Sequence, residues 1–514
     1  MKKLVLRVEN NSTYIIGRMV GEIYDKFKKE LGYLPENAFW MIKNNSEQAN
    51  TKENWKKDWD GYISAVCWNK KYCHCHIKKE GLHFHTGLLA RAVSFFKENN
   101  IPFHRIDNRQ KTEKTDRYSM SEAFEFRDYQ QEIIKKVVGD KENKGIDRGI
   151  IKVATGGGKS SIACGIIAGM GVSPAIFYVP SIDLLRQAKG EIEKFIKENG
   201  EAVEVGTIGG GEKTIRDINV MTIQTAVRAL GGVWKKFDEE DNSKDDTDID
   251  DIRQDIQNLI RNSKLMICDE VQHWAAETCQ IISDASSACQ YKFGMSATPY
   301  RDQGDDILIE GCFGKTVADI SASFLIREGY LIKPTIYFSK ISNMRGLARL
   351  SYANIYKQAI VENGDRNSEI VEMANDFKNS GRQVLILVKQ IAHGKLLESL
   401  ITDSIFMHGG TGKKKRAKHL DIMRKGDPQI TIASVIFDEG IDVRPLNTLL
   451  LAGGGKSPTR ALQRIGRILR PCKGKTDAIA VDFMDTCKYM QSHSKKRANI
   501  YKTEEEFEIL IIGD

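Results

Sequence analysis

Apolar and polar positions along this chain of 514 residues follow two repeated patterns. Short apolar runs alternate with stretches in which apolar residues recur at helical spacing. Such alternation is typical of parallel sheets covered by helices, so the pattern predicts an α/β fold. The runs predict strands at 150–154, 175–179, 218–223, 265–268 and 291–295, and then, after Pro334, at 384–388, 404–407, 430–433, 449–451 and 478–483.

The boundaries of these patterns predict four parts. We expect a small α+β domain over 1–118, two α/β units over 119–332 and 333–490, and a peripheral charged tail over 491–514. Within the first part, the pattern predicts a helix over 88–98. The polar stretch 107–121 reads as a linker between independent cores, and the acidic run 237–255 as an exposed insertion without chemistry.

Composition narrows the class of protein without naming a partner. The chain is 41% hydrophobic and 28% charged, as in ordinary soluble domains, and its net charge of +8 is compatible with nucleic acid. No apolar stretch reaches the roughly 18 residues of a membrane-spanning helix. The first residues lack the apolar run of a signal peptide, so we expect a cytoplasmic protein.

A glycine-rich segment joins the first strand to the next helical pattern. Glycine lets backbone amides turn onto phosphates, the Lys159 ammonium suits β- and γ-phosphates, and the Ser160 hydroxyl suits Mg²⁺. The strict phosphate-loop pattern has Gly where this chain has Val153, so a glycine-rich strand-to-helix turn is the alternative. The candidate nucleotide-binding residues here are Thr155, Gly156, Gly157, Gly158, Lys159 and Ser160.

Two adjacent carboxylates end the apolar strand 265–268. The carboxyl edge of a parallel sheet is where ligands bind, so Asp269 could hold Mg²⁺ together with Ser160. Glu270 could orient and deprotonate an attacking water. Two solvated surface carboxylates would give the same pattern, but the phosphate loop upstream makes that alternative weaker.

Taken in order, these motifs resemble those of superfamily 2 helicases of the DExH type, whose motors are two tandem RecA-like domains. Segment 126–130 is similar to the adenine-reading Q-motif, 154–160 to motif I, and 179–185 to motif Ia. The resemblance continues through Thr222-Ile-Gln-Thr225, Asp269-Glu-Val-Gln-His273, Ser296-Ala-Thr298, 433–442 (motif V) and 463–470 (motif VI). Within the superfamily, 295–301, 359–367 and 437–442 look most like the XPB and phage UvsW group.

The resemblance implies ATP and Mg²⁺ as cofactors and assigns residue roles. Catalysis would rest on Glu270, Lys159 and Gln463, with Arg467 and Arg470 as arginine fingers on one helix face. Other implied nucleotide contacts are Arg127, Gln130, Gly440 and Asp442, and His273, Ser296 and Thr298 would couple hydrolysis to movement. Implied nucleic-acid contacts are Pro180, Ser181, Gly209, Gly210, Thr222, Gln224 and Thr225.

The resemblance implies an ATP-dependent DNA helicase or translocase that works as a monomeric motor in a bacterial or phage-infected host cell. It would move 3′ to 5′ on single-stranded or branched DNA or RNA–DNA hybrids during recombination, repair or replication. Three alternatives stay open: the motor subunit of a restriction system, an ATP-switched nucleic-acid clamp, and an RNA helicase. In the N-terminal part, Trp55, Trp59 and Trp68 could stack against a duplex arm or form a small core.

Four histidines and two cysteines lie outside the helicase pattern. If 72–77 and 82–85 formed a hairpin, His74 would oppose His85 and His76 would oppose His83 on one face. Zinc is one interpretation, but the usual Cys-x₂-Cys spacing is absent. The sequence therefore favours an exposed or DNA-facing strand.

Overall fold

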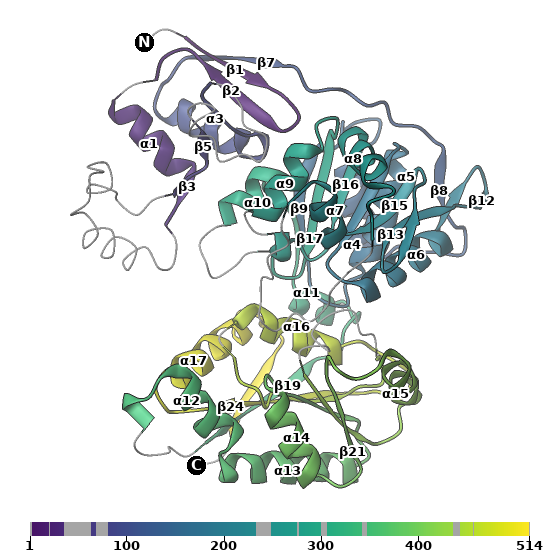
Figure 1. Cartoon of the computed structure of the whole chain (residues 1–514), viewed down its shortest axis with the longest axis vertical. Helices are drawn as coiled ribbons and strands as arrows, with labels where there is room; N and C mark the ends of the chain where they lie inside the picture. The colour runs from purple at the N-terminus through teal and green to yellow at the C-terminus, as the bar shows by residue number, and fades with distance from the viewer. Residues whose placement is uncertain are drawn as a thin grey trace. The chain divides into compact units, whose positions relative to one another are not determined.

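The chain forms two compact units. The computed structural model describes residues 3–19, 21–34, 63–67, 81–232, 248–274, 277–299, 306–341, 347–434, 443–455 and 457–512. One unit comprises 1–152, 159–235 and 245–319, and the other comprises 153–158, 236–244 and 320–514 (Figure 1). Each unit contains a mostly parallel sheet with helices, so the predicted α/β class is confirmed.

The main sheet of the first unit has eight strands in the order β14-β13-β15-β10-β16-β17-β9-β18. Its central strands are buried almost throughout, which explains why they read as continuous apolar runs. The strands are β9 (Arg148–Val153), β10 (Ala175–Val179), β13 (Val205–Gly209), β14 (Glu212–Thr214), β15 (Ile218–Thr222), β16 (Leu265–Cys268), β17 (Tyr291–Ser296) and β18 (Thr316–Ile320). The helices are α4 (Asp128–Val138), α5 (Lys159–Met170), α6 (Ile182–Phe195), α7 (Ile223–Ala229), α8 (Arg253–Asn262), α9 (Glu277–Ala285) and α10 (Asp306–Phe313).

The second unit has a sheet of seven strands in the order β21-β22-β20-β23-β24-β19-β25, and each pair of neighbouring strands is parallel. The strands are β19 (Pro334–Lys340), β20 (Val384–Leu387), β21 (Ser404–Met407), β22 (Ile430–Ala433), β23 (Thr448–Leu450), β24 (Ala478–Met484) and β25 (Glu508–Ile512). The helices are α11 (Ala322–Arg327), α12 (Tyr352–Tyr356), α13 (Gly364–Asn379), α14 (Ile391–Leu400), α15 (Lys413–Lys425), α16 (Pro458–Ile468) and α17 (Met490–Tyr501), with a π-turn at Lys357–Val361.

The last residues of the chain are part of this second sheet, so the prediction of a peripheral tail is wrong. Strand β25 pairs in parallel with β19 at the edge of the sheet. On α17, the buried guanidinium of Arg497 donates to both carboxylate oxygens of Asp482 at 2.8 Å. The Glu504 carboxylate accepts a hydrogen bond from Ser323 N at 2.8 Å. A buried ion pair looks like solvated charge in the sequence, which is why the pattern misled.

The N-terminal part of the first unit is a separate sheet with the strand order β5-β6-β2-β1-β7. Its core packs Phe27 of α1 and Phe96 of α3 against this sheet. The predicted helix over 88–98 matches α3. The elements are β1 (Leu4–Val8), β2 (Ser12–Ile16), α1 (Glu22–Glu30), β5 (Val66–Cys67), β6 (His83–His85), α3 (Leu89–Glu98) and β7 (Phe103–Asp107), with a small pair β3 (Gly32–Tyr33) and β4 (Ile63–Ser64).

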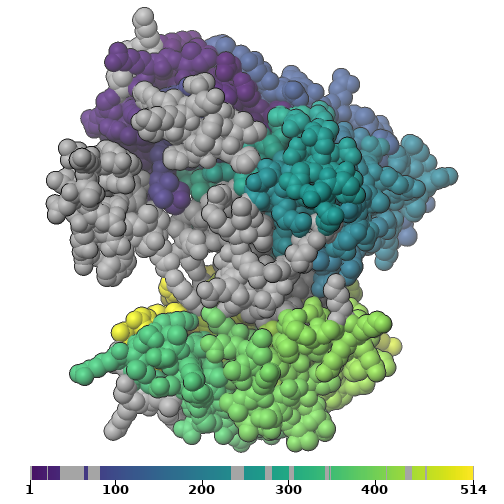
Figure 2. Space-filling view, viewed as in Figure 1, coloured from purple at the N-terminus to yellow at the C-terminus, as the bar shows by residue number. Residues whose placement is uncertain are grey.

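This N-terminal sheet packs directly against the first α/β sheet and its helices. Ile307 and Leu308 of α10 belong to the same hydrophobic core as the N-terminal strands. A Cβ added to Gly87 would lie 2.0 Å from the carbonyl oxygen of Glu310, so the two segments approach as closely as backbone allows. In Figure 2 the N-terminal residues, in purple, lie against the blue residues of the same unit. The prediction of independent cores is therefore wrong.

The stretch read as a linker is also anchored. Thr112 N donates to Gln290 Oε1 at 2.6 Å, and Thr115 Oγ1 donates to the Gly171 carbonyl at 2.6 Å. Its end forms β8 (Tyr118–Met120), which pairs with β11 (Ile196–Glu198); β12 (Glu201–Ala202) completes this small sheet. Polar composition here reflects side chains that bond to the domain surface, so composition alone does not identify a tether.

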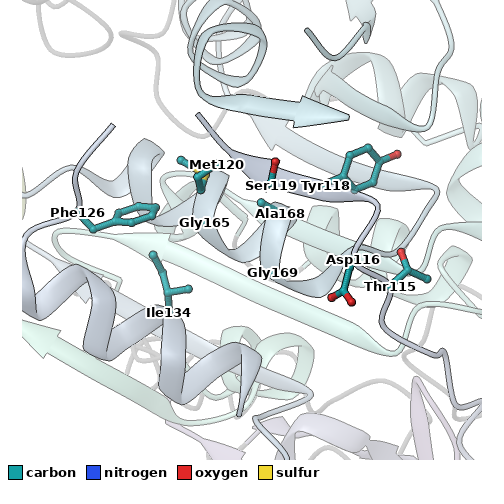
Figure 3. Close-up of a pocket in the computed structure, with 10 residues that line it drawn as sticks. All are labelled: Thr115, Asp116, Tyr118, Ser119, Met120, Phe126, Ile134, Gly165, Ala168 and Gly169. Atoms are coloured by element: carbon teal, nitrogen blue, oxygen red, sulfur yellow. The ribbon is translucent and has the colours of Figure 1, made fainter. Parts of the chain in front are cut away.

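A cavity of about 240 Å³ lies under this anchored segment. Figure 3 shows residues of β8 on one side of α5 and Ile134 of α4 on the other, with Gly165 and Gly169 of α5 between them. None of the predicted nucleotide or nucleic-acid residues lines it. The cavity is therefore a packing feature of the anchored segment, and the candidate site lies elsewhere.

A buried lysine joins the N-terminal sheet to the main sheet. Lys292 Nζ donates to Asn11 Oδ1 at 2.6 Å and to the Ser283 carbonyl at 3.1 Å, and burial lowers the pKa of Lys292 to about 8. Asn11 also donates to the Asp284 carbonyl at 3.1 Å. Because Lys292 is fully buried, its ammonium depends on these acceptors for solvation.

We expect Asn11→Ala to lower the free energy of unfolding of the first unit by about 1–3 kcal/mol, since it leaves a buried ammonium short of an acceptor. Thermal melting should show a loss of about 2–4 °C per kcal/mol. In a Lys292→Met background the same substitution should cost less, because the charge is gone. The control is Asn262→Ala, where an exposed side chain donates to the Asn258 carbonyl. An equal cost of Asn11→Ala in both backgrounds would show that the lysine is not involved.

Two of the four histidines of the predicted hairpin lie on a described strand. His83 and His85 lie on β6, which pairs with β2 on one side and with β5 on the other. Both side chains are buried, so the prediction of an exposed or DNA-facing strand is wrong for them. Cys73, His74, Cys75 and His76 lie outside the described residues. Within the described ranges, no group of three or more His, Cys, Asp or Glu side chains is arranged to hold a metal ion.

Candidate ATP and nucleic-acid site

The predicted residues of the first unit gather at one edge of its main sheet. Strands β13, β15, β10, β16, β17 and β9 run parallel, so all end at the same carboxyl edge. The phosphate-loop and acidic candidates follow β9, β16 and β17, which are neighbours. The nucleic-acid candidates follow β10, β15 and β13, which are also neighbours. The strand order therefore divides this edge into two adjoining halves.

The glycine-rich loop connects β9 to α5 as predicted. Gly156 and Gly158 have φ of 86° and 76°, a backbone conformation that L side chains rarely adopt, so glycine is required there. Lys159 begins α5, and its Nζ lies 3.2 Å from Glu270 Oε1. The sequence places these two residues far apart, and the sheet brings them together as expected for a phosphate-binding lysine and an acidic base.

Glu270 lies at the centre of a hydrogen-bond network. Its Oε2 accepts from Gln272 Nε2 at 2.8 Å and from Ser296 Oγ at 3.4 Å. Ser296 Oγ also lies 2.5 Å from Gln272 Oε1 and accepts from Thr298 N at 2.9 Å. Glu270 has φ of 47°, which is uncommon for a side chain other than glycine and often marks a functional position. Ser296 and Thr298 are thus connected to the candidate base.

Gln272 is the residue whose role the sequence did not reveal. It stands between Glu270 and Ser296, and so links the end of β16 to the end of β17. Only its position within the Asp-Glu-x-Gln-His pattern could have indicated this. The backbone of His273 lies in the 3₁₀ turn Val271–Trp274, and its side chain lies outside what the structure describes.

Asp269 has the properties of a group that holds a cation. It is buried, and its Oδ1 has no hydrogen-bond partner in the part of the chain that the structure describes. Burial, together with the charge of Glu270, raises the pKa of Asp269 to about 7. A divalent cation would favour the ionised carboxylate and provide the missing partner, so the residue fits Mg²⁺. Ser160, in the first turn of α5, is the other candidate ligand.

The Q-motif candidates occupy the start of α4. Arg127 is the N-cap residue, and its backbone N donates to Gln130 Oε1 at 3.1 Å. Arg127 Nη1 lies 3.2 Å from the Tyr129 hydroxyl, and Gln130 is almost fully buried. Gln130 therefore stabilises the beginning of the helix, and its reading of adenine stays a prediction.

The nucleic-acid candidates sit at strand ends and helix starts. Ser181 caps α6, and its Oγ accepts from Leu184 N at 3.4 Å. Thr222 caps α7, and its Oγ1 accepts from Thr225 N at 3.3 Å and lies 2.9 Å from Thr225 Oγ1. Thr222, Thr225 and Gln224 are buried. Pro180 precedes α6, and Gly209 and Gly210 lie at the turn between β13 and β14.

In the second unit, α16 carries part of the predicted arginine pair. Gln463 and Arg467 lie on this helix, which begins after the N-cap Ser457 and ends at Ile468. Arg470 lies beyond the helix end, so the prediction that both arginines share one helix face is wrong. Gly440 and Asp442 lie outside the described residues.

Among the described residues, no helix is long and apolar enough to cross a membrane.

Comparison with known proteins finds two domains in the order that the sequence motifs predicted. Residues 123–301 match the family described as "Type III restriction enzyme, res subunit", and residues 365–472 match "Helicase conserved C-terminal domain". The chain is 26% identical over 462 residues to the DNA 3′-5′ translocase XPB2 of Sulfurisphaera tokodaii, covering 81% of this chain and 96% of that protein.

Two further similarities extend this comparison. The ATP-dependent DNA helicase uvsW of Enterobacteria phage T4 is 25% identical over 243 residues, which are 45% of this chain and 48% of that protein. A fragment of a putative HsdR subunit of a type I restriction enzyme from Vibrio vulnificus has the same fold over 75% of this chain and 68% of its own, with a TM-score of 0.53 and 18% identity. The chain thus has two RecA-like sheets and helicase relatives over most of its length, so it resembles the superfamily 2 helicases and is an ATP-hydrolysing enzyme.

Proposed function

We propose that this helicase translocates along DNA and unwinds or remodels branched DNA or R-loops during recombination, repair or replication. The observation that carries the proposal is the divided carboxyl edge of the first sheet. Candidate ATP residues follow β9, β16 and β17, and candidate nucleic-acid residues follow β10, β15 and β13. Adjacent strands β10 and β16 join the two halves, so a change at one half can reach the other through a packed sheet.

In this proposal each group at the nucleotide half has one task. Lys159 and the backbone amides of 156–158 bind the β- and γ-phosphates, and Asp269 and Ser160 hold Mg²⁺. The cation would supply charge neutralisation at the phosphates. Glu270 positions a water and accepts its proton, and Gln272 keeps the carboxylate oriented. Ser296 and Thr298 are hydrogen-bonded to this network, so a change at Glu270 on hydrolysis moves them and is transmitted to the strand-binding half.

DNA is the favoured substrate because several relatives carry DNA in their names, among them the DNA 3′-5′ translocase that has the longest matched segment. Capped helix starts at Ser181 and Thr222 present backbone amides, which suit phosphates and read no base. We therefore infer binding that depends on salt and little on sequence. The N-terminal sheet, fixed to the first α/β sheet through Asn11 and Gly87, is proposed to contact the branch of the substrate.

A restriction motor is the second candidate. It is favoured by the name of the family that matches residues 123–301 and by the likeness to a type I restriction subunit. In such a system the chain would translocate along DNA while a partner subunit cleaves it. The two functions differ in whether strands are separated and in whether a nuclease partner is needed.

The test is a strand-displacement assay with the full chain, ATP and Mg²⁺ at one salt concentration. The panel contains forked, Holliday-type, R-loop and plain single-stranded substrates of equal length, a version with RNA in one arm, and a triplex whose third strand can be displaced without separation of the duplex. We expect strand release from the branched DNA substrates. ATP hydrolysis with displacement of a triplex strand but no duplex separation would favour the restriction motor, and nucleic-acid binding with neither would indicate a clamp.

A further inference from the structure

Four aromatic rings form a cluster on the second unit. The ring centroid of Tyr352 lies 6.2 Å from that of Tyr356, 5.9 Å from that of Tyr489 and 5.9 Å from that of His493. Tyr356 is buried, and its hydroxyl donates to the Gly453 carbonyl at 2.7 Å. Tyr352 and Tyr489 instead remain 38% and 41% exposed. The cluster therefore has a buried base and two rings that reach solvent.

The cluster lies at the carboxyl edge of the second sheet. Tyr489 follows β24, Lys389 follows β20, and Gly453 follows β23, and these parallel strands are neighbours. Strand β22, whose carboxyl end leads to the predicted motif V, pairs with β20 at the same edge. In parallel α/β sheets this edge is where ligands bind. The exposed rings thus lie at the carboxyl edge of the second sheet, which corresponds to the edge of the first sheet where our proposed function puts ATP and nucleic acid.

Lysines accompany the rings. Lys488 Nζ lies 5.0 Å from the ring centroid of Tyr489, and Lys389 Nζ lies 5.8 Å from that of Tyr356. Asp485, the nearby acidic residue, is buried, and its Oδ1 accepts from Arg366 Nε at 3.1 Å, so it does not present its charge at the surface. Aromatic faces for bases and ammonium groups for phosphates are the combination that binds single-stranded nucleic acid.

The backbone beneath the rings is irregular in two places. Tyr489 has φ of 67° and ψ of −48°, a conformation that is rare for a bulky residue. A π-turn at Lys357–Val361 follows directly after α12, and such turns are frequent at functional sites. A tyrosine that only filled the small core around Ile355 and Met490 would not need a strained backbone to hold it half in solvent.

We propose that Tyr352 and Tyr489 form a stacking site for an unpaired base of the strand bound by the second unit, with Lys488 and Lys389 beside the adjoining phosphates. This inference rests on the proposed function, because it assumes that a nucleic-acid strand crosses this edge. Tyr356 is a positioning residue, since its buried ring and its bond to Gly453 support the exposed pair.

Affinity for a fluorescent oligothymidylate tests the site. The full chain is compared with a Tyr352→Ala/Tyr489→Ala double variant and with a Tyr352→Phe/Tyr489→Phe variant, which keeps the rings. Base stacking on aromatic side chains predicts a roughly 5- to 100-fold weaker affinity for the alanine variant. The phenylalanine variant should stay within about two-fold of the unchanged chain, and the salt dependence of binding should hold in all three because stacking releases no counterions. The matched control is Ile391→Ala/Leu400→Ala, which removes exposed apolar side chains of α14 in the same unit.

A second measurement does not depend on any variant folding. An oligonucleotide carrying 5-iododeoxyuridine should cross-link the unchanged chain at Tyr352 or Tyr489 on irradiation. Unchanged affinity in the alanine variant, an equal loss in the phenylalanine variant, or cross-links found only elsewhere would each overturn the stacking site. If the unchanged chain binds the oligonucleotide and hydrolyses ATP in its presence, the proposed function stands even when the stacking site fails. If it binds none, the proposed function fails.

Discussion

Glu270→Gln should bind ATP and nucleic acid with nearly unchanged affinity and hydrolyse ATP roughly 10²- to 10⁴-fold more slowly, which is the usual contribution of a general base. Glutamine keeps the size of the side chain and an oxygen that can accept from Gln272 and Ser296, so the network of the site can persist. What it loses is the ability to take a proton. Steady-state hydrolysis and equilibrium binding of a fluorescent ATP analogue measure the two effects separately.

Lys159→Ala should behave differently, with nucleotide binding lost together with turnover. Its ammonium lies 3.2 Å from Glu270 Oε1, and it is the cation whose charge lowers the pKa of Asp269. Without it, two adjacent carboxylates face the phosphates alone. The control for Glu270→Gln is Glu204→Gln, which makes the same chemical change at an exposed residue paired with Arg216. If the variants at 159 and 270 lost nucleotide equally, the assignment of binding to one and proton transfer to the other would be wrong.

Periodicity identified the buried strands well, for a physical reason. Strands β10, β16 and β22 have the bounds that the apolar runs predicted, because all of their residues are buried. The edge strand β21 also has the predicted bounds, although only Phe406 and Met407 of it are buried. Strand β13 was missed since Gly206, Thr207 and Gly209 interrupt its apolar pattern, although the strand is buried. Strand β19 was missed because it begins at Pro334 and carries Ser339 and Lys340. Whether such a segment forms a strand depends on its neighbours in the folded sheet, and the apolar pattern of the sequence does not reveal those neighbours.

The sequence motifs predicted the residues of the candidate site better than the apolar and polar pattern predicted how the N-terminal sheet is attached. Lys159, Glu270 and Ser296 are brought together by the order of the strands, as the motifs implied. The attachment of the N-terminal sheet was not predictable, because it depends on a lysine and an asparagine that look like surface residues. Lys292 and Asn11 become fully or nearly fully buried only when the two sheets meet. A prediction from apolar patterns treats polar residues as exposed, so it fails where two polar residues are buried together and satisfy each other's hydrogen bonds.

Arg467→Lys should reduce the rate of ATP hydrolysis by about 10³- to 10⁵-fold while leaving nucleotide affinity nearly intact, if Arg467 is an arginine finger. An ammonium keeps the charge but cannot present two parallel N–H donors to the γ-phosphate. Arg470→Lys should have the same effect on the chemical step. Because Arg467 lies on α16 and Arg470 beyond its end, their backbones are held in different ways, and the two variants test two separate positions.

Arg467 and Arg470 are held by different contacts within the second unit. Arg467 is fixed by a helix that is capped at Ser457, so its position is set by the packing of α16. Arg470 follows the C-cap residue Leu469, and its carbonyl accepts a hydrogen bond from Lys475 Nζ at 2.9 Å. We therefore expect Lys475→Ala to weaken hydrolysis modestly through Arg470 and to have no further effect in the Arg470→Lys background. Single-turnover hydrolysis with saturating ATP and oligonucleotide compares the unchanged chain with Arg467→Lys, Arg470→Lys, Lys475→Ala and the Arg470→Lys/Lys475→Ala double variant under one condition. Near-normal turnover in Arg470→Lys would leave Arg467 as the remaining finger, and an additive effect of Lys475→Ala in that background would show that the lysine acts on the fold and not through Arg470.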